Sequence, residues 1–467
     1  MAMDGHPVDG IPNLPPGPKL PRWIQTLGFM FFNRRWVDWA HRRYGDAVTF
    51  RSLFDSCFVM VFSPELVKQV FRAPPDRLRA GEANALLGPI VGERSVLLLD
   101  GREHMRQRKL LLPPFHGERM RAYQEVMVEA TDRVVDAWRA GQTVTLLPAM
   151  QELTLEVIER TVFGVADVHR REELTRRVRA LLDPVNSRGQ VLMLVLTGGR
   201  RGAGAGEDFT RARHELDELL FEEIGRRREV ADLDQREDVL SMLLCARDEE
   251  GEPMTDGELR DELLTLLVAG HETTATALAW AFELLMRNPD ACAGLGIHAH
   301  SGNGPDPEVN ARLDAVVKET LRLRPVISGV GRVIREEPFE LGGYTLPVGM
   351  EINPSIAGIH RRADHYPRPG DFDPSRYGGD GAPDTYTWVP FGGGTRRCLG
   401  ASFATFEMRT VIRRVLERVE MAPAGPPEKG VRRSIVYVPE KGVRVQVASV
   451  REGAGADSPS SSPVTVT

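Results

Sequence analysis

One uninterrupted helical pattern runs from Asp256 to Asn288, in the second half of a chain of 467 residues. Thr255 and Glu258 have the spacing of a capping box at its start, and Pro289 follows its end. About 30 residues at about 1.5 Å per residue give a helix of about 45–50 Å, which is long enough to cross a whole domain. Most other segments also show helical periodicity, so the predicted fold class is mainly α with small β-sheets.

The middle of this helix contains polar residues in an otherwise apolar pattern: residues 269–274 read Ala-Gly-His-Glu-Thr-Thr. A carboxylate and hydroxyls inside a core cost free energy unless they are hydrogen-bonded. They indicate either a kink stabilised by threonine bonding back to the helix or a polar groove with a chemical role. His271-Glu272 begins like a zinc-protease helix, but position 275 is alanine instead of the second histidine that such a site needs.

A single cysteine ends a glycine-rich, basic loop at residues 391–400, which read FGGGTRRCLG. The glycines let the backbone turn tightly and approach a flat cofactor, and Phe391 can cover one face of the sulfur. Arg396, Arg397 and the start of the following helix supply positive charge that lowers a thiol pKa. A lone cysteine is more often a buried structural residue, but this loop favours a thiolate that points at iron. A thiolate ligand to haem favours O–O cleavage.

Composition excludes several classes of protein. A net charge of −6 gives no indication of a nucleic-acid partner. The four cysteines are far apart, which argues against a disulfide framework or a structural zinc site and is typical of a reducing compartment. No stretch has the roughly 20 apolar residues of a membrane-spanning helix, so we expect no transmembrane anchor and a cytoplasmic protein.

The predicted organisation is an extended lead-in at 1–20, a single catalytic domain at 21–450 and a disordered tail at 451–467. Residues 47–51 and 57–62 are predicted to form a β-hairpin, and Ser63 is predicted to cap the next helix. Helices are also predicted at 34–44, 101–112, 118–140, 153–163 and 209–229, with a glycine-rich connector at 198–206. That connector lacks the Gly-Lys-Ser/Thr of a phosphate-binding loop.

The loop at 391–400 resembles the haem-ligand loop of the cytochrome P450 family. The matching residues are Phe391, Gly394, Arg396, Cys398 and Gly400. The resemblance implies the P450 fold, with haem b (iron protoporphyrin IX) between the long helix and this loop. It also implies that Cys398 is the axial ligand of the haem iron.

Further family signatures occur in the expected order. Glu319 and Arg322 match a Glu-x-x-Arg motif, and Arg376 lies in a Phe-x-Pro-x-Arg segment whose next residue is Tyr377, where Phe is commoner. In isolation, such a Glu–Arg pair is more often a solvated surface pair. The resemblance implies instead that Glu319, Arg322 and Arg376 form a buried structural triad that holds the Cys398 loop.

The resemblance also implies roles near the haem. Arg396, Arg108, His104 and Arg332 are expected to hold its two carboxylates, a task that suits arginine, although each could also be an ordinary surface charge. On the long helix, Ala269 and Gly270 are expected to make room over the iron. Thr273 is expected to donate a hydrogen bond to bound dioxygen, and Glu272 to help relay protons.

The function implied is that of a soluble, bacterial-type haem-thiolate monooxygenase acting on a lipophilic organic substrate. Small apolar segments at 86–90 and 326–329 are the expected substrate lining. No flavin or iron–sulfur motif is present, so electrons are expected from a ferredoxin with its ferredoxin reductase, bound near Lys109, Arg397 and Arg409. Two alternatives stay open: a P450-fold peroxygenase or isomerase, and a haem sensor or carrier without turnover.

Overall fold

The structure is a computed structural model that describes residues 13–31, 33–53, 57–115, 117, 119–164, 167–185, 207–297, 306–378, 383–433 and 435–452. The predicted connector at 198–206, most of the predicted tail and the first part of the predicted lead-in lie outside the described residues. The described part of the lead-in is extended. Its Pro15 and Pro16 carbonyls accept hydrogen bonds from the hydroxyl and the amide of Thr49.

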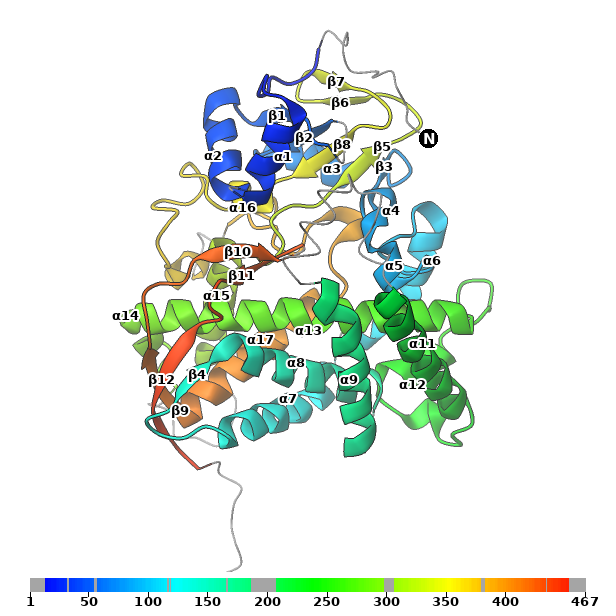
Figure 1. Ribbon diagram of the computed structural model, residues 1–467, viewed down its shortest axis with the longest axis vertical. Helices are drawn as coiled ribbons and strands as arrows, with labels where there is room; N and C mark the ends of the chain where they lie inside the picture. The colour runs from blue at the N-terminus through cyan, green and yellow to red at the C-terminus, as the bar shows by residue number, and fades with distance from the viewer. Residues whose placement is uncertain are drawn as a thin grey trace, which may run out of the picture.

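Helices make up most of the described chain (Figure 1). They are α1 Arg22–Phe31, α2 Asn33–Tyr44, α3 Pro64–Arg72, α4 Ala80–Ala83, α5 Gly88–Val91, α6 Gly101–Leu111, α7 Arg119–Asp136, α8 Leu146–Val162, α9 Val168–Val185, α11 Glu207–Arg228, α12 Val239–Cys245, α13 Asp256–Arg287, α14 Pro289–Ala293, α15 Pro307–Leu323, α16 Ile356–Ile359 and α17 Ala401–Arg418.

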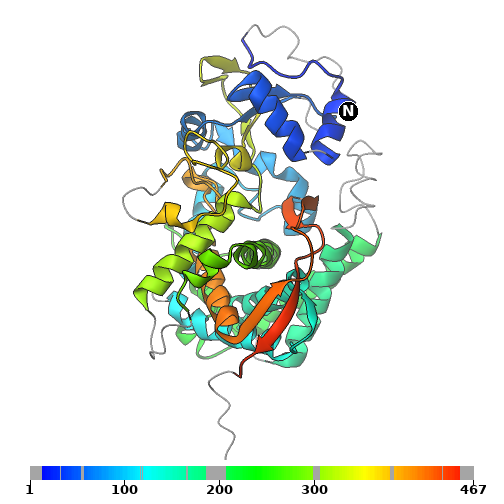
Figure 2. The same cartoon turned by 90° about the vertical axis from the view of Figure 1, so that its left-hand side faces the viewer.

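The long predicted helix is α13, which crosses the whole helical part of the molecule (Figure 1). The predicted capping box is present: the Glu258 amide donates to the Thr255 hydroxyl, and the Thr255 amide donates to the Glu258 carboxylate. Viewed end-on, α13 lies at the centre, with the orange α17, the yellow-green α15 and the cyan helices α7 and α8 around it (Figure 2). Because other elements surround it, nearly every side chain in its C-terminal half is buried.

The strands of the described residues form four small sheets, of which the largest and the β6-β7 pair lie near α1 and α2 (Figure 1). The largest has the order β1-β2-β8-β5-β3, in which β2 and β8 are parallel and the other pairs are antiparallel. A three-stranded sheet has the order β4-β12-β9, and β6-β7 and β10-β11 are two-stranded. The strands are β1 Ala47–Phe50, β2 Phe58–Val61, β3 Leu78–Arg79, β4 Thr143–Thr145, β5 Arg332–Ile334, β6 Phe339–Leu341, β7 Tyr344–Leu346, β8 Glu351–Pro354, β9 Val419–Pro423, β10 Gly430–Arg433, β11 Val436–Pro439 and β12 Arg444–Val450.

The predicted fold class and hairpin agree with these elements, and Ser63 caps α3 by accepting a hydrogen bond from the Leu66 amide. The main difference is α8, which begins at Leu146, seven residues before the predicted start at 153. Pro148 lies in its first turn, where a proline costs no intrahelical hydrogen bond because the amides there have no partner within the helix.

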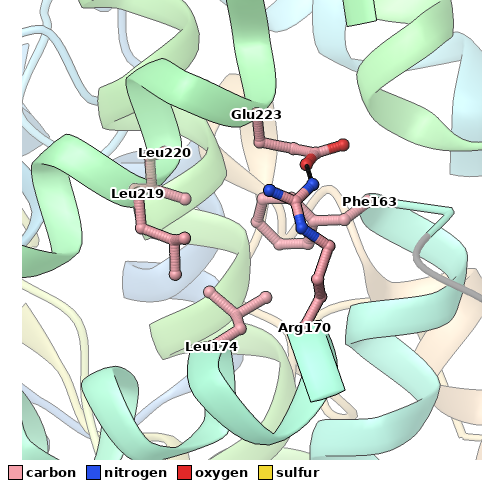
Figure 3. Close-up of a pocket in the computed structure, with 6 residues that line it drawn as sticks. All are labelled: Phe163, Arg170, Leu174, Leu219, Leu220 and Glu223. Carbon is pink, nitrogen blue, oxygen red and sulfur yellow. Dashed lines mark hydrogen bonds and ion pairs between the residues drawn. The ribbon is translucent and has the colours of Figure 1, made fainter. Parts of the chain in front are cut away.

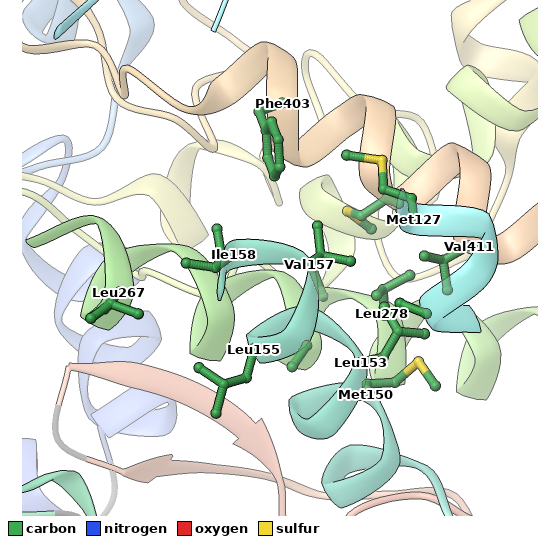
Figure 4. Packing of buried hydrophobic residues seen from close by; sticks show 14 of the residues in the cluster. Met127, Met150, Leu153, Leu155, Val157, Ile158, Leu267, Leu278, Phe403 and Val411 are labelled. Atoms are coloured by element: carbon green, nitrogen blue, oxygen red, sulfur yellow. The ribbon is translucent and has the colours of Figure 1, made fainter. Parts of the chain in front are cut away.

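The largest hydrophobic core fills the space between α7, α8, α13 and α17, where Met127, Leu153, Leu278 and Val411 meet (Figure 4). A second core lies beneath the five-stranded sheet, and a third joins α2 to β1 and β2. Among the described residues, no helix combines the length and the apolar character that a membrane span requires.

Candidate active site

The Cys398 loop is held in place from both sides. The Cys398 amide donates to the Phe391 carbonyl at 3.0 Å, which closes the loop. The ring of Phe391 meets Trp388 edge-on, with 6.1 Å between the ring centres, and the Trp388 indole donates to the Lys318 carbonyl of α15. The loop is therefore anchored to α15 before the cysteine, and α17 begins directly after it.

Two glycines of this loop are required by a neighbouring helix. Gly394 has a φ of +66°, and a Cβ atom there would lie 2.1 Å from the Phe71 carbonyl oxygen of α3. A Cβ at Gly393 would lie 2.3 Å from the Phe71 ring. These two glycines therefore let α3 pack closely against the Cys398 loop. At Gly400, a Cβ would meet no atom of the described part of the chain within 4 Å.

Four cationic or ionisable groups predicted from the sequence lie near one another. His104 and Arg108 are on α6, Arg332 begins β5, and Arg396 is in the Cys398 loop. Burial and repulsion from the neighbouring guanidinium groups lower the pKa of His104 to about 3. Burial and mutual repulsion likewise lower the pKa of Arg332 to about 10. The ring of His104 is therefore neutral and is surrounded by positive charge.

Among the described residues, one carboxylate forms an ion pair with this cluster. It is Asp100, whose partner is Arg396. Burial lowers the pKa of Arg396 to about 10, and Asp100 opposes that effect. The buried Nδ1 atom of His104 has no hydrogen-bond partner among the described residues. The cluster therefore has three guanidinium groups but one carboxylate, and it contains a buried nitrogen without a partner among the described residues. A bound group that brings further carboxylates, as haem does, would balance this charge.

The Cys398 thiol is solvent-accessible, yet protein atoms lie around it on most sides. Burial raises the pKa of the thiol, while the Gly400 amide and the positive charges of Arg108 and Arg397 lower it. Arg396, which was also expected to lower this pKa, is engaged elsewhere: it donates to the carbonyls of Val96 and Leu99. A metal cation at the sulfur would supply the charge that stabilises a thiolate.

Two carbonyls at the centre of α13 accept hydrogen bonds from threonine hydroxyls. The Thr273 hydroxyl donates to the Ala269 carbonyl at 2.7 Å, and Thr154 of α8 donates to the His271 carbonyl at 3.0 Å. The first is the threonine back-bond that one interpretation of the sequence predicted. Ala269 itself is exposed, although most of α13 is buried. A Cβ at Gly270 would lie 2.8 Å from Ile158, so this glycine lets α8 pack closely against α13.

Glu272 points toward α8, where the Gln151 side-chain amide donates to its carboxylate at 2.7 Å. The adjacent His271 donates from Nδ1 to the Leu267 carbonyl at 2.6 Å, and its Nε2 is 4.0 Å from the Glu272 carboxylate. The sequence analysis missed Gln151 and Thr154. They could have been recognised as two polar residues, three positions apart, on an otherwise apolar face of one helix.

The members of the predicted triad are in contact: Glu319 and Arg322 are fully buried, and Arg376 is partly buried. The Arg322 guanidinium donates two hydrogen bonds of 2.7 Å to the Glu319 carboxylate, and Arg376 donates to the same carboxylate at 3.3 Å. Arg322 also donates to backbone carbonyls of three residues: His360, Pro369 and Asp371. The triad therefore ties α15 to the segment that leads to the Cys398 loop.

His360 is a further residue that the sequence analysis missed. It is completely buried, and its Nε2 accepts a hydrogen bond from the Val389 amide at 2.9 Å. Burial lowers the pKa of His360 to about 3, so the ring is neutral and can accept this bond. It connects α16 to the start of the Cys398 loop.

The predicted electron-donor surface is less positive than its sequence suggests. Lys109 pairs with Glu249 at 2.6 Å, and Arg409 pairs with Asp314 at 3.2 Å. Arg397 is exposed beside Cys398. Arg397 is therefore the member of this group with the charge most available to a partner.

Two pockets lie away from the predicted site residues. The first, of about 20 Å³, is enclosed by leucines of α9 and α11, by Phe163 and by the Arg170–Glu223 ion pair (Figure 3). The second, of about 410 Å³, lies beside Tyr123 and Asp238. Neither is lined by the predicted substrate segments at 86–90 and 326–329.

Comparison with known proteins agrees with this geometry. Residues 15–447 match the family model described as Cytochrome P450. Proteins of Mycobacterium tuberculosis named as cytochromes P450 135B1 and 135A1 are 39% and 37% identical, over 94% and 95% of this chain and 92% and 97% of their own. A solved cyanobacterial structure, retinoic acid-bound CYP120A1, has a TM-score of 0.79 at 24% identity, covering 94% of this chain and 100% of its own.

The fold and the family model define a haem enzyme of mainly helical architecture. The chain belongs to the cytochrome P450 family, and its reaction class is that of a haem-thiolate monooxygenase.

Proposed function

We propose that this monooxygenase inserts one atom of dioxygen into a lipophilic organic molecule, with Cys398 as the axial ligand of haem b. The observation that carries this proposal is the cation cluster beside the Cys398 thiol. Its members come from α6, β5 and the Cys398 loop and lower one another's pKa values. Such repulsion is costly unless anionic groups offset it, and the two carboxylates of haem are suitable anions.

Within this proposal, Arg108, Arg332, Arg396 and His104 bind those carboxylates. Phe391 covers one side of the sulfur, and Gly394 and Gly400 give the loop its shape. When bound, haem supplies the chemistry that activates dioxygen. The triad of Glu319, Arg322 and Arg376 holds the loop in place. Residues 21–450 then act as one catalytic domain.

On the other side of the site, we assign proton handling to Thr273 and Glu272. The Thr273 hydroxyl now donates to Ala269, and rotation about its side chain would redirect that donor into the site. Gln151 fixes one oxygen of Glu272 and leaves the other to accept or release a proton. Ala269 is the exposed surface against which the substrate would lie.

The substrate class follows from the segments proposed to line the site. Leu86 is 70% exposed, and Ile90 and Val326 are buried apolar residues. Side chains of this kind bind through apolar contact and favour a lipophilic molecule. Electrons would come from a ferredoxin with its reductase, which binds near Arg397, and the enzyme would act in the cytoplasm.

The test is turnover with an added ferredoxin and ferredoxin reductase. Lipophilic compounds are first screened for a substrate-induced spin-state change of the haem. Those that respond are then incubated with isotopically labelled dioxygen. One labelled oxygen atom in the product supports the proposal, whereas oxygen derived from peroxide alone would make the enzyme a peroxygenase.

A further inference from the structure

Helix α1 exposes large apolar side chains and buries polar ones, although its Phe29 packs against Phe50 of the N-terminal core. Its buried side carries the polar residues Gln25 and Thr26, while Trp23 is 56% exposed and Leu27 is 38% exposed. On the surface of a globular protein, positions such as those of Trp23 and Leu27 are normally polar. Tryptophan is highly buried on average, so its exposure here calls for an explanation.

The polar residues are buried because they organise the backbone around α1. The Gln25 side-chain amide donates to the Pro18 and Leu20 carbonyls, and its oxygen accepts from the Arg51 amide. Thr26 accepts from the Leu53 amide at 3.0 Å. These bonds bring Leu53, which is 51% exposed, next to α1. Leu20 precedes Trp23 by three residues and is also exposed.

Helix α2 presents an outer face of the same character. Val37 and Ala40 are buried in the N-terminal core. Trp39 is exposed and shares its helix face with Arg35, four residues before it, and Arg43, four residues after it. Trp36, stacked on Trp39 with 4.9 Å between ring centres, packs on α1 at Gly28, where a Cβ would lie 2.8 Å from its ring.

Apolar exposure and positive charge coincide in this region. Of the nine large apolar side chains that are exposed among the described residues, five lie between positions 20 and 53. Residues 13–53 contain seven Lys or Arg and two Asp, whereas the whole chain has a net charge of −6. Asp4 and Asp9 precede this stretch, and the net charge stays positive when they are included. Figure 1 shows α1 and α2 together at one end of the molecule.

We propose that this end of the protein, formed by Leu20, Trp23, Leu27, Trp39, Leu53 and the arginines around them, binds the surface of a bilayer that contains anionic lipids. An interfacial helix of this kind inserts apolar side chains into the headgroup region while basic residues meet lipid phosphates. Tryptophan is suited to this boundary because its ring is both apolar and hydrogen-bonding. Binding would be peripheral and reversible, and it does not depend on the proposed substrate or site residues.

The test is co-sedimentation of the full-length, haem-loaded protein with vesicles. We expect binding to phosphatidylcholine vesicles that contain phosphatidylglycerol, and weak binding to phosphatidylcholine alone. The double variant Trp23→Ser and Leu27→Ser should bind the anionic vesicles at least about tenfold more weakly, since two apolar side chains no longer insert. Arg35→Gln with Arg43→Gln should weaken binding most at low ionic strength.

The matched control is Ile435→Ser. Ile435 is an exposed apolar residue like Trp23 and Leu27, with 49% exposure, but it lies between β10 and β11. It should bind like the wild type. The absorption spectrum and circular dichroism of each variant report whether the fold is intact. The proposal is overturned if the wild type does not sediment with anionic vesicles, if the double variant binds as well as the wild type, or if the surface binds nucleic acid in place of vesicles.

Discussion

Asp100 and Arg396 form an ion pair although they are 296 residues apart in the chain. The same Asp100 carboxylate accepts hydrogen bonds from three backbone amides at the start of α4: those of Ala80, Gly81 and Glu82. One side chain thus holds both a short helix and an arginine of the Cys398 loop.

Asp100→Asn should therefore lower the free energy of unfolding by about 1–3 kcal/mol, because charge-assisted bonds to Arg396 and to the amides are weakened. The measurement is denaturant unfolding followed by circular dichroism. Glu250→Gln, an exposed carboxylate on a loop, is the control and should have little effect. Equal stability of Asp100→Asn and wild type would show that this link contributes nothing.

Glu319→Gln should destabilise the protein by about 3–5 kcal/mol, because it leaves the buried charge of Arg322 without its partner. Thermal or denaturant unfolding measures the loss. Arg368→Gln is the control from the same region, since the Arg368 side chain is largely exposed and its pair with Asp371 is a surface pair. A loss for Glu319→Gln as small as that of the control would contradict a structural role for the triad.

Glu159 on α8 makes stability depend on pH. It is buried, accepts a hydrogen bond from Thr175 of α9 at 2.7 Å, and has its pKa raised by burial from 4.5 to about 7. Between these two pH values the folded state binds more protons than the unfolded state. Stability attributable to this group is therefore greatest below pH 4.5 and falls until about pH 7.

Glu159→Gln removes this dependence and keeps the acceptor for Thr175. At pH values above 7 the variant should be more stable than the wild type by up to about 3 kcal/mol, and the difference should vanish toward pH 4.5. Unfolding curves at several pH values test this. Glu152→Gln, exposed on the same helix, should show no such trend. If the difference in stability between Glu159→Gln and the wild type were the same at every pH, Glu159 would be ionised in the folded state.

Thr273→Ala should lower the amount of product formed per dioxygen consumed by about tenfold or more, because a positioned proton donor is lost. Dioxygen uptake, peroxide release and product are measured together. Thr265→Ala is a matched control: Thr265 lies on the same helix and also donates to a carbonyl four residues earlier, that of Asp261. Unchanged coupling in Thr273→Ala would leave Thr273 with only a role in shaping α13.

Arg397→Glu should slow reduction by a ferredoxin by about tenfold at low ionic strength, with a smaller effect at high ionic strength. Arg409→Glu should have a weaker effect, because Asp314 already offsets the charge of Arg409. Stopped-flow reduction under carbon monoxide measures the rate. The haem spectrum must stay unchanged, since Arg397 also lowers the pKa of Cys398. Equal rates for the two variants would argue against Arg397 as the contact.

Patterns among neighbouring residues were sufficient to predict many of the helices and their caps. The capping box at Thr255 and Glu258 and the cap at Ser63 depend on neighbouring residues, and both are present. The start of α8 was missed because Pro148 suggests an interruption unless its place in the first turn is known. Some of the residues that the family motifs single out also lie close together, as Arg108 does with Arg396 and Cys398.

Contacts between distant segments could not be predicted in the same way. The need for glycine at 394 comes from the Phe71 carbonyl, and Glu272 is held by Gln151 of another helix. Asp100 looks like an ordinary acidic residue until the fold places Arg396 beside it. Each of these depends on how helices pack, which neither periodicity nor motif spacing specifies.

The central claim is that Cys398 ligates the haem iron, and the absorption spectrum of the reduced protein with carbon monoxide tests it most directly. The wild type should show the red-shifted Soret band of thiolate-ligated haem, and Cys398→Ala should lose that band. A wild-type spectrum typical of imidazole ligation, or a thiolate-type band that persists in Cys398→Ala, would contradict the account.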